Sequence, residues 1–132
     1  MSDDLQFLQG RVPGYSGYGD PELRHDTDER VRAFVGERVN ALRERIATQL
    51  DPAALAALDA LIFRCQFADQ SFIHRLDKDH FSESDTDALV ATDRELVETA
   101  GGVESADAAS YGPIVAKLDA IFSRRHEPVS AL

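Results

Sequence analysis

The most apolar run of the chain, residues 52–76, constrains the possible folds more than any other segment. Its apolar residues recur at spacings of three and four, which predicts one amphipathic helix with a broad apolar face. The residues of that face are Leu55, Leu58, Leu61, Ile62, Cys65, Phe72, Ile73 and Leu76. A second, narrower face carries Phe63 and Phe67. Because a helix that is apolar on two sides needs neighbours on both, we expect this helix to be the central one.

Three further amphipathic runs predict three more helices, over residues 21 to about 50, 82 or 84 to 100, and 113 to about 125. An Asp suited to the N-cap position, followed by Pro, opens the first of these and also the apolar helix. No segment alternates between apolar and polar residues as a half-buried strand does. The sequence therefore predicts an all-α fold, a four-helix up-down bundle with a wrapped N-terminal loop, in a single domain over residues 1–132.

Residues 1–20 are expected to form a non-helical or partly helical arm. Within it and just after it, residues 12–21 contain two prolines and three glycines, which exclude a regular helix. The same stretch carries three bulky side chains, so we predict a defined loop that packs on the helices, against the narrower face of the central helix. These side chains are Val12, Tyr15 and Tyr18. Residues 77–80 are expected to form a polar loop, and residues 127–132 a frayed tail.

The loop sequence Pro-Gly-Tyr-Ser-Gly-Tyr, residues 13–18, precedes a highly charged stretch from residue 21 to residue 32. This arrangement resembles the opening of small uncharacterised prokaryotic all-helical proteins, in which a PGY-x-GY segment precedes a charged first helix. The resemblance covers roughly the first quarter of the chain. It implies a helical fold and no particular activity.

Three predicted helices carry an Asp inside an apolar stripe: Asp28, Asp69 and Asp93. Burial of an unpaired carboxylate is unfavourable, so each needs a cation, hydrogen-bond donors or access to water. Asp28 is close to a helix start, and we expect Asp93 near an edge of the bundle, where water reaches it. Asp69 interrupts the most apolar face, so we predict that it is buried, ionised and paired with one of two arginines of the neighbouring helix, Arg24 or Arg38.

The alternative interpretation of these carboxylates is a polar binding site between the helices. Its candidate binding residues are Tyr15, Tyr18, Arg24, Asp28 and Asp69. We predict no metal ligands, because the chain lacks the Glu-x-x-His motif of di-iron bundles and its four histidines show no paired helical spacing. Asp77–His80 resembles a ligand cluster only loosely. No nucleophile motif, phosphate loop or dinucleotide fingerprint occurs, so we predict neither catalytic residues nor a cofactor.

The formal net charge of −10 argues against nucleic acids and anionic membrane surfaces as partners. The N-terminus has neither a basic start nor an apolar segment typical of a signal peptide, and no run approaches the roughly 20 apolar residues of a membrane span. We therefore expect a cytoplasmic protein. Its one cysteine, Cys65, excludes an intrachain disulfide and is expected to be a small buried apolar residue.

The composition and the four helices favour a non-enzymatic protein that acts by association with itself or with another protein. A dimer is the simplest form, with Phe63 and Phe67 buried against the second copy. In a competing account the N-terminal loop covers these two rings within one chain. The alternative function is that of a bundle that binds a small molecule or a metal at the polar site.

Overall fold

The structure is a computed structural model that describes residues 3–77, 81–125 and 127. Over these residues the chain forms helices and no strands, which confirms the all-α prediction. The α-helices are α1 (Asp3–Arg11), α2 (Arg24–Ile46), α3 (Pro52–Gln66), α4 (Gln70–Leu76), α5 (Glu83–Gly101) and α6 (Tyr111–Arg124). Short 3₁₀ turns at Pro21–Leu23, Ala47–Gln49 and Gly102–Ser105 complete the described secondary structure.

Two predicted segments fall largely outside the described residues. Of the polar loop over 77–80, only Asp77 is described, and of the frayed tail over 127–132, only Glu127. Among the helices that are described, none is long and apolar enough to cross a membrane.

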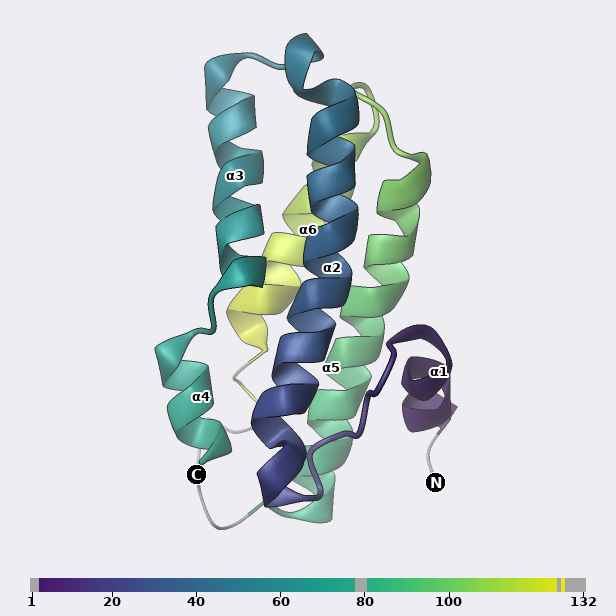
Figure 1. The fold of residues 1–132 in the computed structure, drawn as a ribbon, viewed down its shortest axis with the longest axis vertical. Helices are drawn as coiled ribbons and strands as arrows, with labels where there is room; N and C mark the ends of the chain where they lie inside the picture. Colours follow the sequence, from purple (N-terminus) through teal and green to yellow (C-terminus); the bar gives the residue numbers. More distant parts are fainter. Residues whose placement is uncertain (1–2, 78–80, 126, 128–132) are drawn as a thin grey trace.

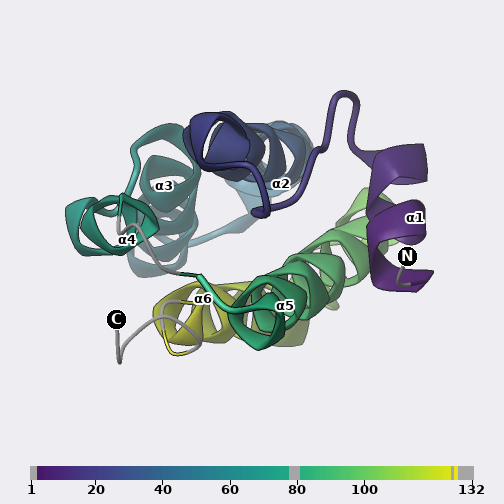
Figure 2. The ribbon, with the colours of Figure 1, turned by 90° about the horizontal axis from the view of Figure 1, so that it is seen from below.

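The four longest helices, α2, α3, α5 and α6, run alternately up and down along the long axis of the molecule (Figure 1). Seen end-on, α2 and α3 form one layer and α5 and α6 form the other (Figure 2). The expected count of four helices is not confirmed, because α1 and α4 add two short helices. Moreover, α2 packs against α3, α4 and α5, so it takes the central place expected of residues 52–76.

The single helix expected over residues 52–76 is wrong, because the chain breaks it between α3 and α4. The start is as expected: Asp51 caps α3 by accepting a hydrogen bond from the backbone N–H of Ala54 at 2.8 Å. Phe67 and Asp69 then have extended backbones, and Asp69 caps α4. A side chain that satisfies the free N–H groups of a new helix start favours ending the old helix there, and the apolar periodicity alone does not reveal this.

The apolar core runs along the facing sides of the long helices. From α2 it contains Val31, Val35, Val39, Leu42 and Ile46, and the other helices contribute mainly leucines, such as Leu58, Leu89, Leu96 and Leu118. The approach of α2 to α3 is close at Gly36, where an added Cβ would lie 2.9 Å from the Cβ of Cys65. Cys65 is buried, as expected from its place on the apolar face.

The N-terminal arm is partly helical, which is one of the two expected forms, because α1 occupies Asp3–Arg11 and packs on α5. The loop that follows turns at Gly14 and Gly17, whose φ angles of 78° and 75° favour glycine. Its three bulky side chains, Val12, Tyr15 and Tyr18, are all buried, which confirms that the loop is packed on the helices.

The packing partner expected for this loop is wrong. Figure 2 shows the loop beside the N-terminal end of α2, between it and α1. It does not cover the narrower face of α3, since Phe63 is 61% exposed and Phe67 58% exposed. The reason is that the hydroxyls of Tyr15 and Tyr18 donate hydrogen bonds to a carboxylate of α5, as described below. The rings of Phe63 and Phe67 carry no hydrogen-bond acceptor.

Candidate functional site

A cluster of buried charged and polar side chains lies at the end of the molecule where α2 begins and α6 ends. Asp28 belongs to the second turn of α2, Asp93 to the middle of α5, and Arg125 directly follows α6. Because the long helices alternate in direction along the chain, the start of α2 and the end of α6 lie at the same end of the molecule (Figure 1). Tyr15 and Tyr18 reach this level from the N-terminal loop, and all five side chains are nearly inaccessible to solvent.

Arg125 is the centre of this cluster, which we call the buried network. Its Nε donates to Oδ1 of Asp93 at 3.0 Å, and its Nη1 donates to Oδ1 of Asp28. Its Nη2 donates to the hydroxyl of Tyr18 at 2.8 Å. The other oxygen of Asp93 accepts from Tyr15 at 2.9 Å and from Tyr18 at 2.5 Å. The carboxylate of Asp93 therefore receives hydrogen bonds on both oxygens, an arrangement that fits its ionised form.

The pKa values of the network follow from burial and from its charges. Burial raises the pKa of Asp93, while Arg125 and the two tyrosine hydroxyls oppose the rise. Burial also raises the pKa values of Tyr15 and Tyr18 well above the usual value for tyrosine. For Arg125, burial is the largest single effect and lowers the pKa, but the interactions with Asp93, Tyr18 and Asp28 together raise it overall. The tyrosines thus act as neutral donors and Arg125 as a permanent cation.

Two further arginines of α2 extend the network to the ends of α3 and α4. Arg32 donates from Nε to Oδ2 of Asp28 at 2.9 Å and from Nη1 to the carbonyl of Cys65 at 3.2 Å. Arg24 donates from Nε to the carbonyl of Tyr18 at 2.8 Å and from Nη1 to the carbonyl of Leu76 at 3.3 Å. The last carbonyls of a helix have no partner within it, so Arg32 stabilises the end of α3, where the chain breaks before α4, and Arg24 stabilises the end of α4.

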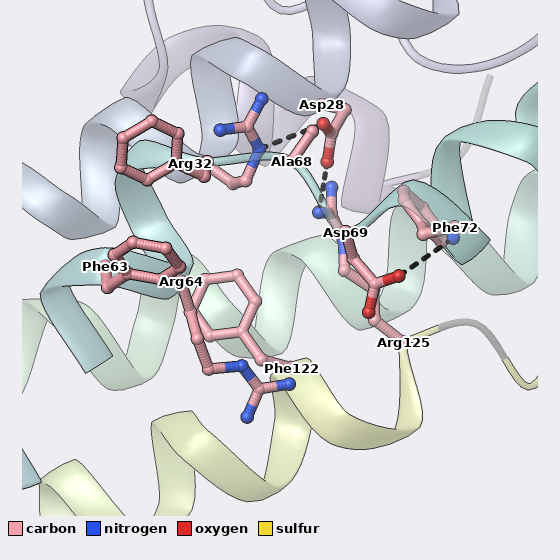
Figure 3. A pocket seen from close by; sticks show the side chains of 10 residues that line it. Asp28, Arg32, Phe63, Arg64, Ala68, Asp69, Phe72, Phe122 and Arg125 are labelled. Carbon is pink, nitrogen blue, oxygen red and sulfur yellow. Dashed lines mark hydrogen bonds and ion pairs between the residues drawn. The ribbon is translucent and has the colours of Figure 1, made fainter. Parts of the chain in front are cut away.

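A cavity of about 190 Å³ opens beside the buried network, between α2, the α3–α4 junction and the end of α6 (Figure 3). Its charged side chains are Asp28, Arg32, Arg64, Asp69 and Arg125, and its apolar ones are Phe63, Phe67, Ala68, Phe72 and Phe122. The rings of Phe63 and Phe122 lie on one side of the cavity, and Asp28, Asp69 and Arg125 lie on the other. The cavity is therefore amphipathic, with a mainly apolar wall, which also holds Arg64, and a mainly charged wall, which also holds Phe72.

The exposed part of the apolar wall is a pair of aromatic rings. Phe63 and Phe67 lie with their ring centroids 4.7 Å apart. Together with Leu23, they are the large apolar side chains that remain exposed over the described part of the chain. Deeper in the cavity, the ring of Phe72 is already covered, because the guanidinium of Arg125 stacks on it at 4.6 Å from the ring centroid.

The structure brings the five candidate binding residues to one region but not to one surface. Asp28 and Asp69 line the cavity. Tyr15 and Tyr18 lie behind it, where they bind Asp93 and Arg125. Arg24 is outside the lining, and its guanidinium stacks on Phe81 at 4.0 Å from the ring centroid.

The predicted buried pair of Asp69 with Arg24 or Arg38 is wrong. Asp69 is exposed, and its Oδ1 accepts hydrogen bonds from the backbone N–H groups of Ser71 at 2.9 Å and Phe72 at 3.2 Å. Arg38 instead donates to Glu104 at 3.0 Å. Because the helix breaks before Asp69, its side chain leaves the apolar face and needs no buried cation.

Sequence reasoning missed three members of the site. Asp93 is fully buried, not placed at an edge that water reaches. Arg125 stands at a helix end, where a cation is favoured in any case, but it also stands seven residues after the buried Leu118 and so continues the apolar stripe of α6. An arginine at a stripe position of α6, together with an Asp in the stripe of α5, is the sequence signal that could have predicted the pairing of Arg125 with Asp93. Arg32 follows Asp28 by four residues, a spacing that also favours an ion pair.

Other kinds of site find little support among the described residues. No group of three or more His, Cys, Asp or Glu side chains there is arranged to hold a metal ion. Burial raises the pKa of the Cys65 thiol to about 12, so at neutral pH it is not the thiolate that a nucleophile requires.

Comparison with known proteins gives no relative for this chain: no family model matches it, and neither the curated proteins nor the solved structures contain a significant match. The resemblance of the N-terminal segment to small prokaryotic helical proteins therefore stays a prediction.

Proposed function

We propose that this protein is a non-enzymatic binding protein whose site is the amphipathic cavity between α2, the α3–α4 junction and α6. In this proposal the four long helices act as an up-and-down bundle that holds the site, and the ligand is a small molecule with an apolar body and a polar end. A cytoplasmic location stays a prediction.

The observation that carries the proposal is the contrast between the two walls of the cavity. Phe63 and Phe67 are more than half exposed. The opposite wall holds Asp28 and Arg125, which are almost completely buried and fixed by hydrogen bonds. Ligand sites of proteins typically combine apolar surface with a few rigidly placed polar groups.

The size of the cavity limits the ligand. A cavity of about 150 Å³ can hold benzene. The volume of about 190 Å³ found here therefore suits a single ring or a short branched chain with a compact polar head. Nucleotides and other large cofactors are too bulky for it.

Titration of the ¹⁵N-labelled protein with benzyl alcohol, a neutral molecule with one ring and one hydroxyl, tests the proposal. We expect saturable amide shift changes at millimolar concentration, confined to the α3–α4 junction, the start of α2 and the end of α6. The variant Phe67→Ser removes one exposed ring of the cavity and should weaken binding several-fold. Leu23→Ser removes an exposed apolar side chain outside the cavity and is the matched control. Shift changes scattered over the whole surface, or none, would contradict the proposal.

A second candidate function is association through the same exposed rings, either with a second copy of this chain or with another protein. The exposure of Phe63 and Phe67 favours it, because large apolar side chains side by side on a surface often mark an interface. Light scattering at micromolar concentration tests self-association. A parent protein that is a dimer, with a monomeric Phe63→Ser variant, would support this candidate. A monomeric parent protein would contradict self-association.

A further inference from the structure

We infer that the ligand of the cavity is a free α-amino acid with an apolar side chain, a class recognised by one cation and one anion of the charged wall. This inference rests on the proposed function, because it names the ligand of the same site. It follows from an inventory of the hydrogen-bonding groups that line the cavity and of the groups that already have partners.

Two charged groups of the lining are already satisfied within the protein. Arg125 donates from all three of its nitrogen atoms to the buried network. Both oxygens of Asp28 accept from guanidinium groups, one from Arg125 and the other from Arg32. Among the described residues, Arg64 donates only from Nη1, to Asp119 at 2.7 Å and to Ser123 at 3.1 Å, at the surface of α6. Arg125 and Asp28 therefore leave little for a ligand to bind.

Three charged side chains of the lining keep a free position over the described residues. Arg32 uses Nε and Nη1 in the contacts described above, while its Nη2 has no partner there. Arg64 uses only Nη1 among these residues, so its Nε and Nη2 are free as well. Asp69 uses only Oδ1, to cap α4, and its Oδ2 has no partner there. The two arginines offer charged donors and Asp69 a charged acceptor, so the lining fits a ligand that carries both an anionic and a cationic group.

The ion pairs around the cavity leave groups of both signs for a ligand. The cations Arg32 and Arg125 are paired with the anions Asp28 and Asp93. Asp69 forms no ion pair among the described residues, and a ligand ammonium group would supply one. A ligand carboxylate would bind the remaining donor of Arg32, so a zwitterion would use both groups, whereas a simple anion or cation would use one.

The apolar wall determines the rest of the ligand. Its exposed rings, Phe63 and Phe67, present aromatic faces to the cavity opening, where an aliphatic or aromatic side chain would bury apolar surface. A leucine-sized or phenylalanine-sized amino acid suits the cavity volume of about 190 Å³. The rings themselves offer a polar side chain no hydrogen-bonding group, so polar amino acids should bind less tightly than apolar ones.

Calorimetric titration with three matched compounds tests the inference: L-phenylalanine, 3-phenylpropionate, which lacks the amino group, and phenethylamine, which lacks the carboxylate. We expect L-phenylalanine to bind about tenfold more tightly than either of the others, the size of effect expected for one charge-assisted hydrogen bond. If 3-phenylpropionate or phenethylamine binds as tightly as L-phenylalanine, the inference is overturned.

The variant Asp69→Asn separates ligand recognition from helix capping, because Asn caps a helix as well as Asp but carries no charge. It should weaken L-phenylalanine binding about tenfold and leave the affinity for 3-phenylpropionate unchanged. An equal loss for both compounds would contradict the role of Asp69. If benzyl alcohol binds at the cavity and none of the three compounds does, the inference fails while the proposed function stands. If benzyl alcohol and all three compounds fail to bind, both fall.

Discussion

The middle of α5 and the junction between α3 and α4 each place an aspartate next to large apolar side chains, and they satisfy it in opposite ways. Asp93 stays inside a continuous helix and is fully buried, with two tyrosines and Arg125 as donors. Asp69 ends one helix, begins the next and stays exposed, with two backbone N–H groups as donors. Buried side chains of two other segments, the N-terminal loop and the end of α6, bind the first carboxylate, and the backbone of its own helix start binds the second.

The difference shows that an interrupted apolar stripe has two physical solutions. When partners from other elements converge, the helix continues and the carboxylate is buried at the expense of its hydration. When they do not, the side chain binds the backbone next to it, and the helix breaks. The first solution couples distant parts of the chain, whereas the second is local. Variants at the two positions should therefore differ strongly in stability.

The largest expected effect is at the buried carboxylate. Asp93→Ala should lower the free energy of unfolding by about 3–5 kcal/mol, because it leaves Arg125 with one anion fewer and deprives two buried tyrosine hydroxyls of their acceptor. Urea unfolding measures it. Asp93→Asn keeps the shape and removes the charge, so it separates the loss of charge from the loss of volume. A loss below about 1 kcal/mol for Asp93→Ala would mean that the network does not stabilise the fold.

The second prediction concerns alkaline pH, where the network differs from the exposed junction. Burial raises the pKa values of Tyr15 and Tyr18, so the unfolded chain releases their protons near pH 10 while the folded chain retains them. The folded state then binds more protons, and its stability falls as pH rises. The stabilisation is complete below about pH 10, and above it each tyrosine should cost up to about 1.4 kcal/mol per pH unit.

Urea unfolding measured between about pH 9 and 11 tests this dependence. The Cys65 thiol, whose pKa is raised to about 12, adds to the same fall. Tyr15→Phe therefore removes one of three groups, and the fall in unfolding free energy above about pH 10 should become roughly a third less steep. The slope is independent of the lower overall stability that the lost hydrogen bond to Asp93 causes. A slope identical to that of the parent protein would show that Tyr15 does not stay protonated in the fold.

The sequence predicts the local features of this molecule well and its long-range contacts poorly. The helix start at Asp51, the all-α class and the buried Tyr-bearing loop follow from capping chemistry, periodicity and bulky loop residues. The pairing of Asp93 with Arg125 spans 32 residues, and that of Asp28 with Arg125 spans 97. Such pairs depend on which helix ends meet in space. The periodicity of one segment carries no information on that point.

The break at Asp69 could not be predicted for a different reason. Residues 52–76 have the apolar spacing of a single helix, and the tendency of Asp to cap a helix competes with it. The outcome depends on Arg32, which binds the carbonyl of Cys65 at the end of α3. A contact from a neighbouring helix thus decides where α3 ends.

The third prediction sharpens the contrast at the exposed carboxylate. Asp69→Ala should lower the free energy of unfolding by about 1 kcal/mol, the usual effect of losing an N-cap, which is well below the effect at Asp93. Asp69→Asn should change it by only a few tenths of a kcal/mol, because Asn caps equally well. Thermal unfolding of the two variants measures the difference. A loss of 3 kcal/mol or more for Asp69→Ala would mean that Asp69 is part of a buried ion pair after all.

The smallest effect is expected at the rings beside this junction. Phe67 is 58% exposed and its backbone is extended, a conformation that serine also adopts, so Phe67→Ser should change the free energy of unfolding by no more than about 0.5 kcal/mol. Leu23→Ser, at an exposed apolar side chain outside the cavity, should behave alike.

Chemical unfolding at a low and a high micromolar protein concentration adds a second readout, because stability that depends on association rises with concentration. A parent protein that gains stability with concentration, while Phe67→Ser does not, would show that the ring is buried between two chains. If unfolding is independent of concentration in all three proteins, the rings are not buried between chains. They are then exposed to solvent, as a ligand cavity requires.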